Sequence, residues 1–139
     1  MSPRQQPRRS AMTRHRVHVR RVYAAVDADD GTRVLVDRLW PRGLTTSAAH
    51  IDDWANDVAP STELRVWFHH EPARFAEFRR RYLDELAAPT SQAALDHLSA
   101  IADRGPLTLL TGTRDLAHSQ AAVLAELLER MEAGRTGAG

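Results

Sequence analysis

VLVDRLWPRG, residues 34–43, places charged and turn-forming residues directly behind an apolar run. The three apolar residues predict a strand that is buried on both faces, as in a parallel sheet. This strand ends in Asp37, and Arg38 and Arg42 follow it closely. Because charged groups are costly to bury unless they are paired or used, we expect binding or catalysis at this strand end.

The other apolar patterns divide the chain into further strands and helices. Ile51, Trp54 and Val58 follow helical spacing, which predicts one helix over residues 46–58. Asp115 is a suitable N-cap for the final helix. The expected strands are 16–23, 32–37 and 107–111, and the expected helices are 46–58, a short one after Ser61, 72–88, 91–104 and 116–131.

The order strand, strand, helices, strand, helix predicts an α/β fold with a small, mainly parallel central sheet flanked by helices. The link between the first two strands is shorter than a usual parallel crossover, so an antiparallel hairpin is a second possibility there. Residues 16–132 are expected to form a single layered domain. Residues 1–15 are expected to be a disordered Arg-rich leader and residues 133–139 a disordered tail.

Composition limits the location and the partners. All 19 basic residues are arginine, and seven of them lie in residues 1–21; the remainder holds twelve arginines against 18 acids, a net charge of −6. The leader can bind nucleic acid or an acidic partner, but the acidic remainder argues against a broad nucleic-acid surface. No apolar stretch reaches the roughly 20 residues that span a bilayer, and no signal peptide is recognisable, so a cytoplasmic location is expected. The oligomeric state is open.

Two strand ends carry the candidate functional residues. In open α/β sheets, ligands bind beyond the carboxyl ends of the strands, so the two clusters share one crevice if the strands are parallel neighbours. Arginines and a helix N-terminus favour phosphate or carboxylate, and carboxylates or a histidine can transfer protons. The candidate ligand-binding residues are Arg38, Trp40, Arg42, Thr111 and Arg114, and the candidate catalytic residues are Asp37, Asp115 and His118.

Each candidate also has a structural interpretation. Arg38 can pair with Asp37 or Asp115, Trp40 can be a core aromatic, and His118 can be a surface residue. His69 and His70 suggest a metal, but adjacent histidines at a joint rarely bind one ion. We therefore predict neither a metal nor a cofactor, and the absence of cysteine excludes disulfides and thiolate chemistry.

The chain resembles the YeaO-like branch of the family called domain of unknown function 488, over about residues 17–129. The resemblance implies a compact α/β fold in a bacterial cytoplasmic protein and brings no established activity. Distant branches carry cysteine near the last strand, which is missing here. The matching segments are 30–43, 51–54, 59–65, 67–72, 78–82 and 107–118.

Two functions fit these observations. One is a crevice for a phosphate- or nucleotide-type anion, as in a hydrolase or a transferase acting at a phosphoryl or glycosidic centre. The other is a non-catalytic accessory module that binds nucleic acid or protein. The sequence leaves open whether the protein is an enzyme.

Overall fold

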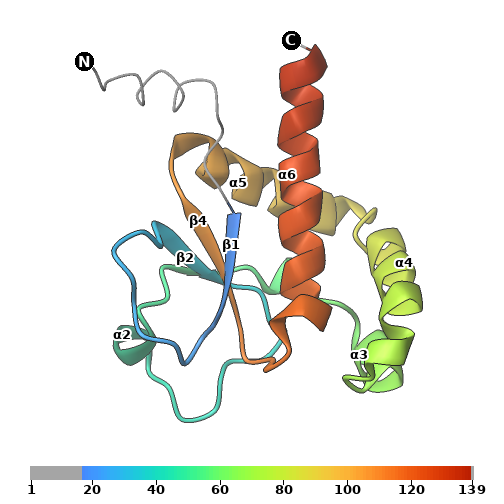
Figure 1. The fold of residues 1–139 in the computed structure, drawn as a ribbon, viewed down its shortest axis with the longest axis horizontal. Coiled ribbons are helices and arrows are strands. Elements are labelled where there is room, and N and C mark those ends of the chain that lie inside the picture. Colours follow the sequence, from blue (N-terminus) through green and yellow to red (C-terminus); the bar gives the residue numbers. More distant parts are fainter. Residues whose placement is uncertain (1–16, 139) are drawn as a thin grey trace.

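An all-parallel, four-stranded sheet forms the centre of the computed structural model, which describes residues 17–138 (Figure 1). The strands are β1 (Val17–Arg21), β2 (Thr32–Leu35), β3 (Asp53–Trp54) and β4 (Leu107–Thr111), and their order across the sheet is β1-β4-β2-β3. Each neighbouring pair is parallel. The α/β fold predicted from the sequence is therefore confirmed.

The first two strands do not form a hairpin, because β4 lies between them and is parallel to both. Residues 22–31 carry the chain from the end of β1 back to the start of β2 without a helix. Ten residues reach about 33 Å when extended, which exceeds the roughly 15 Å length of these strands. Gly31 completes the link at φ +65°, where an added Cβ would lie 2.1 Å from the Pro106 carbonyl oxygen.

Most of the predicted helices are present with shifted ends. The expected helix 72–88 is a 3-10 turn, η2 (Pro72–Arg74), followed by α4, and α5 begins at Pro89, which suits a first helical position because it lacks an amide proton. The α-helices are α2 (Thr46–Ala49), α3 (Thr62–Phe68), α4 (Phe75–Glu85), α5 (Pro89–Arg104) and α6 (Gln120–Ala138), with further 3-10 turns η1 (Asn56–Val58) and η3 (Leu116–His118).

The final helix starts later and extends further than expected. Residues 116–118 form η3, and α6 begins after Ser119, whose hydroxyl accepts the Ala122 amide at 3.2 Å. Ser119, not Asp115, thus caps the helix. The helix includes residues 133–138, where a tail was expected. The predicted leader, residues 1–15, lies outside the described residues.

The single helix predicted over residues 46–58 is wrong. The chain forms the short α2, then β3, then η1. His50 at φ +52° ends the helical path. The following backbone pairs with β2 instead, since the Asp52 amide donates to the Arg33 carbonyl at 2.8 Å and the Ala55 amide to the Leu35 carbonyl at 2.8 Å.

Two apolar clusters cover the two faces of the sheet. The larger one packs the helices α3 to α6 against one face, with Val34 from β2 and Leu109 from β4. The smaller one, around Leu35 and Leu110, lies on the opposite face under α2 and the loop before it. Most of the helical mass therefore lies on one side of the sheet.

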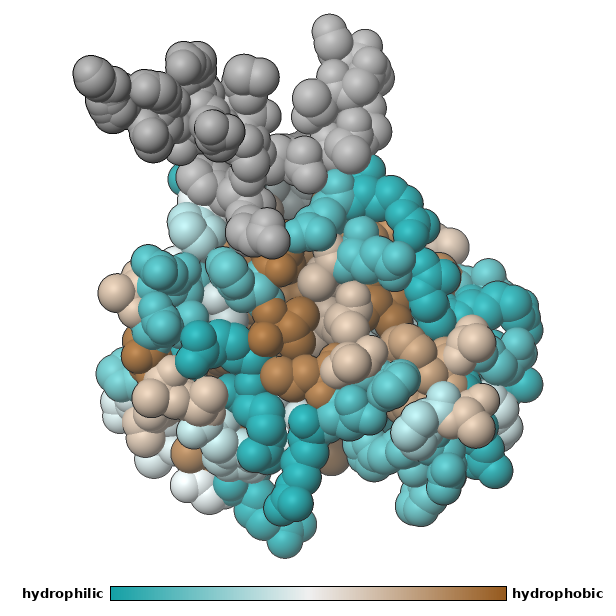
Figure 2. Space-filling view, in the orientation of Figure 1, coloured by the Kyte–Doolittle hydropathy of each residue, from teal (hydrophilic) through white to brown (hydrophobic). Residues whose placement is uncertain are grey.

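The surface in the view of Figure 1 is hydrophilic at its margins and apolar in a central strip where α6 lies beside β1 (Figure 2). Within residues 17–138, no helix is long and apolar enough to cross a membrane.

A buried ion pair links the start of β2 to α2. Arg33 donates to Asp30 at 2.5 Å, to the Ala49 carbonyl at 3.0 Å and to the His50 carbonyl at 3.0 Å. Burial alone would raise the pKa of the Asp30 carboxyl. Hydrogen bonds from the Asp27 amide and Arg33, with nearby arginine charges, hold that pKa below its ordinary value of 3.8.

We predict that Asp30→Asn lowers the free energy of unfolding by about 3 kcal/mol at pH 7, because it leaves the buried Arg33 without its partner. A carboxyl whose pKa is lowered by folding stabilises the protein above its ordinary pKa, and this contribution is lost as the pH falls through the folded value. The difference from wild type should therefore shrink at pH 3. Urea unfolding at both pH values measures it.

The exposed Asp29→Asn is the matched control and should change stability by less than about 0.5 kcal/mol. Equal stability of the Asp30 and Asp29 variants at pH 7 would contradict the role given to the ion pair.

Candidate functional site

The carboxylate of Asp37 joins the ends of the two central strands. One oxygen accepts the Thr111 hydroxyl at 2.7 Å and the Gln120 side-chain amide at 2.5 Å, and the other accepts the Gly112 backbone amide at 2.8 Å. The Asp37 carbonyl also accepts the indole N–H of Trp54 at 2.7 Å. Asp37 therefore ties β2 to the end of β4, to the first residue of α6 and to β3.

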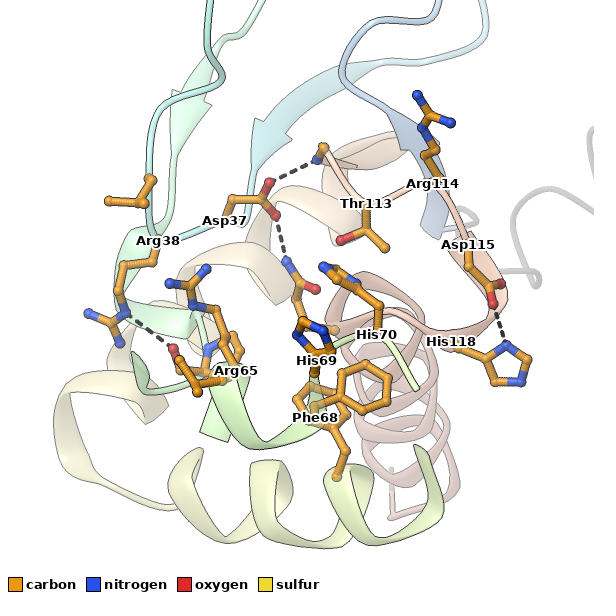
Figure 3. Close-up of a pocket in the computed structure, with 16 residues that line it drawn as sticks. Asp37, Arg38, Arg65, Phe68, His69, His70, Thr113, Arg114, Asp115 and His118 are labelled. Atoms are coloured by element: carbon orange, nitrogen blue, oxygen red, sulfur yellow. Dashed lines mark hydrogen bonds and ion pairs between the residues drawn. The ribbon is translucent and has the colours of Figure 1, made fainter. Parts of the chain in front are cut away.

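A pocket of about 670 Å³ opens beside this carboxylate (Figure 3). It lies beyond the carboxyl ends of β2 and β4, which are parallel neighbours, so residues that follow both strands line one crevice. Its walls come from the segments that follow these two strands and from α3 and α4. The lining residues include Asp37, Arg38, Leu39, Arg65, Val66, Phe68, His69, His70, Phe78, Thr113, Arg114, Asp115, His118 and Gln120.

The predicted site residues fall into two groups. Five of the eight line the pocket, and three do not. Thr111 is fully buried and donates to Asp37. Trp40 donates to the Leu44 carbonyl at 2.8 Å and packs edge-on against Trp54, with ring centroids 5.3 Å apart. Arg42 is exposed, and its carbonyl accepts the Tyr23 hydroxyl.

Arg38 lines the pocket without a carboxylate partner. Its guanidinium donates to the Pro60 carbonyl at 3.1 Å and to the Ala59 carbonyl at 3.4 Å. Within residues 17–138 it forms no ion pair with Asp37 or Asp115, so the salt-bridge interpretation does not describe it. Neutral carbonyls hold the side chain in place and leave its charge uncompensated.

Asp115 and His118 form a pair at the far side of the pocket. The Nδ1 of His118 lies 2.8 Å from an Asp115 carboxylate oxygen, and the ring packs edge-on against Phe75 at 5.2 Å. Arg114, between the strand end and this pair, is exposed, and its guanidinium forms no ion pair within the described part of the chain. Figure 3 shows Arg114 at the rim, apart from the centre.

Three cationic or titratable side chains at the centre of the pocket come from α3 and the joint after it, not from a strand end (Figure 3). Arg65 lines the pocket, and its Nε is buried without a hydrogen-bond partner among residues 17–138. His69 and His70 have φ angles of +48° and +55°. The sequence suggested the histidines as metal ligands or, more simply, as helix caps packed on neighbouring aromatic side chains, and Arg65 was not among the predicted site residues. The adjacent histidines were the available signal.

The left-handed backbone at the two histidines is unusual. The left-handed region disfavours residues with a Cβ by roughly 1–2 kcal/mol each, and strained backbone gathers at functional sites. His69 ends α3, with its amide donating to the Arg65 carbonyl at 3.0 Å. No group of three or more metal-ligating side chains occurs in the described residues.

The arginine run at 79–81 belongs to the surface of α4. Arg79 pairs with Glu126, and Arg80 and Arg81 both pair with Glu77. Hydrogen bonds from these two arginines lower the pKa of Glu77 to about 2. Each arginine of the run is thus paired with an acid on the helical surface, and none of the three lines the pocket.

Fold and site together define an α/β protein with a cation-rich pocket at the carboxyl ends of its central strands. The chain belongs to the family described as the inactive DUF488-N3 subclade, whose model matches residues 16–138. This confirms the family resemblance inferred from the sequence.

Two bacterial relatives illustrate the family. A Mycobacterium tuberculosis protein, Rv3073c, is 51% identical over 113 residues, which cover 81% of this chain and 93% of the relative. YeaO of Escherichia coli K12 is 41% identical over 115 residues, which cover 83% of this chain and 98% of the relative. Both are described as uncharacterised. No solved structure matches the chain significantly.

We predict that Asp37→Asn lowers the free energy of unfolding by about 1–3 kcal/mol. The NH2 that replaces one carboxylate oxygen cannot accept a hydrogen bond, so at least one of the three donors at Asp37 loses its acceptor. Chemical denaturation measures the change, with the exposed Asp115→Asn as control. A more stable Asp37→Asn protein would indicate instead a carboxylate kept for catalysis at a cost in stability.

A second prediction concerns the strained joint. His69→Gly should be more stable than His69→Ala by about 1 kcal/mol, because glycine adopts the left-handed conformation without a Cβ penalty. Both variants remove the imidazole, so their difference isolates the backbone. Thermal and urea unfolding provide the comparison, and an alanine variant at least as stable as the glycine variant would refute strain at this position.

Proposed function

We propose that this protein binds a small phosphate-type anion in the pocket and does not transform it chemically. The observation that supports this proposal is how the charged side chains of the pocket are paired. Both aspartates of the pocket are occupied, Asp37 by three donors and Asp115 by His118. The arginines Arg38, Arg65 and Arg114 have no carboxylate partner among the described residues. The pocket is therefore short of negative charge.

The available donors suit an oxyanion. A buried guanidinium N–H without a partner is costly, and an anion next to Arg65 would remove that cost. Guanidinium groups bind phosphate through charge-assisted hydrogen bonds. His69 and His70 lie beside Arg65 in the centre of the pocket (Figure 3) and add further nitrogen atoms that can donate.

The occupied carboxylates argue against acid–base catalysis. A general base needs a lone pair within reach of the proton it removes. At Asp37 three of the roughly four lone-pair positions of the carboxylate accept hydrogen bonds, from Thr111, Gly112 and Gln120. The description of the family as inactive agrees with binding without turnover. Nucleic-acid binding by residues 1–15 stays a prediction, because these residues are not described, and so does the cytoplasmic location.

We predict that Arg65→Gln weakens binding of inorganic phosphate at least tenfold. The variant removes the central charge of the pocket and keeps a similar side-chain length. Arg104→Gln, at the opposite end of β4 from the pocket, removes the same charge and should change the affinity by less than twofold. Titration followed by amide NMR at fixed ionic strength measures both, with shifts expected at Gly112 and Thr113.

Equal losses in the two arginine variants would contradict a specific site and indicate general charge attraction. Release of phosphate from a phosphate ester during long incubation with the wild-type protein would contradict the non-catalytic part of the proposal.

A further inference from the structure

Two large apolar side chains of the pocket are exposed to solvent. Leu39, just after β2, is 65% exposed, and Val66, on α3, is 68% exposed. Single exposed apolar residues are ordinary. These two come from different segments, however, and both line the pocket that contains the unpaired arginines.

The size of the pocket also exceeds the needs of an inorganic anion. Phosphate has five heavy atoms and fills on the order of 100 Å³, given about 30 Å³ per water molecule in the liquid. The pocket holds about 670 Å³, within the range of roughly 300–1,000 Å³ that is typical for small organic ligands. Most of its volume is thus available to a group other than the anion.

Charged and apolar side chains line the same pocket. Arg65, His69 and His70 lie together at its centre (Figure 3). Leu39 and Val66 keep two thirds of their surface accessible. A ligand with an anionic group at the arginine and an apolar group over these two side chains would use both regions at once.

We infer that the natural ligand is an organic phosphate monoester, with its phosphate held by Arg65 and an apolar or aromatic group covering Leu39 and Val66. This inference rests on the proposed anion-binding function and adds the class of ligand. Phosphate fits better than a carboxylate because its three terminal oxygens can accept from more of the guanidinium and imidazole N–H groups that line the pocket. Leu39 and Val66 are then the specificity-determining residues.

The test compares phenyl phosphate, methyl phosphate and benzoate by isothermal titration at one ionic strength. Wild type should bind phenyl phosphate at least tenfold more tightly than methyl phosphate, because the ring covers apolar surface. Benzoate should bind more weakly than phenyl phosphate. The double variant Leu39→Ser/Val66→Ser should bring the phenyl-to-methyl ratio to within about twofold, mainly by weakening the binding of phenyl phosphate.

Val26→Ser is the matched control, since Val26 is 48% exposed and does not line the pocket. It should keep the wild-type ratio, and all variants should give wild-type circular dichroism. Equal affinities of wild type for phenyl and methyl phosphate would overturn this inference alone. Failure of both phosphates to bind would overturn the proposed function as well. Tighter binding of benzoate than of phenyl phosphate would indicate that the natural ligand carries a carboxylate and not a phosphate.

An unchanged phenyl-to-methyl ratio in the double variant would also overturn the inference. If that variant instead converted a dimeric wild type into a monomer, Leu39 and Val66 would form a protein interface and not a ligand surface.

Discussion

The carboxylate of Asp37 accepts hydrogen bonds from a strand hydroxyl, a loop amide and the first residue of α6, all within 2.8 Å. These donors come from three segments that meet at the ends of the sheet. Their positions set the distance between the walls of the pocket, because β2 and β4 both end there. The geometry of the pocket therefore depends on one side chain that is itself satisfied. Rigidity at this point favours a site that holds a ligand in one place.

The same carboxylate explains why location alone is a weak guide to chemistry. Charged residues at the carboxyl ends of parallel strands suggest an active site on any α/β sheet, and Asp37 occupies that place. Its lone pairs nevertheless serve the fold. The groups without a carboxylate partner are cationic, namely Arg65, whose Nε is buried without a hydrogen bond, and Arg38, which donates to carbonyls. A site whose carboxylates are hydrogen-bonded and whose arginines lack a carboxylate partner is suited to binding an anion.

The sequence predicted the central strands well and the segment between them badly, for one physical reason. Val34 and Leu109 belong to short apolar runs that are buried on both faces, which is a local signal. Ile51 and Val58 follow helical spacing, but they are buried in different clusters on opposite faces of the sheet. One straight helix cannot serve both faces. The pairing of β3 with β2 and the contacts of Arg33 with α2 join residues that are distant in the sequence, so a short stretch of sequence does not reveal them.

The candidate site, like the fold, was predictable from the sequence only in part. Arg38, Arg114 and His118 were found because they follow strands, whereas Arg65, His69 and His70 lie at a helix end that topology brings across the sheet. Histidine gives no sign in the sequence of a left-handed backbone, which glycine would adopt at lower cost. Stability therefore does not explain the imidazoles at this joint, nor the exposed Leu39 and Val66 beside them. These side chains do not add to the stability of the fold, and they gather around one cation-rich pocket. This is the arrangement expected where a ligand binds.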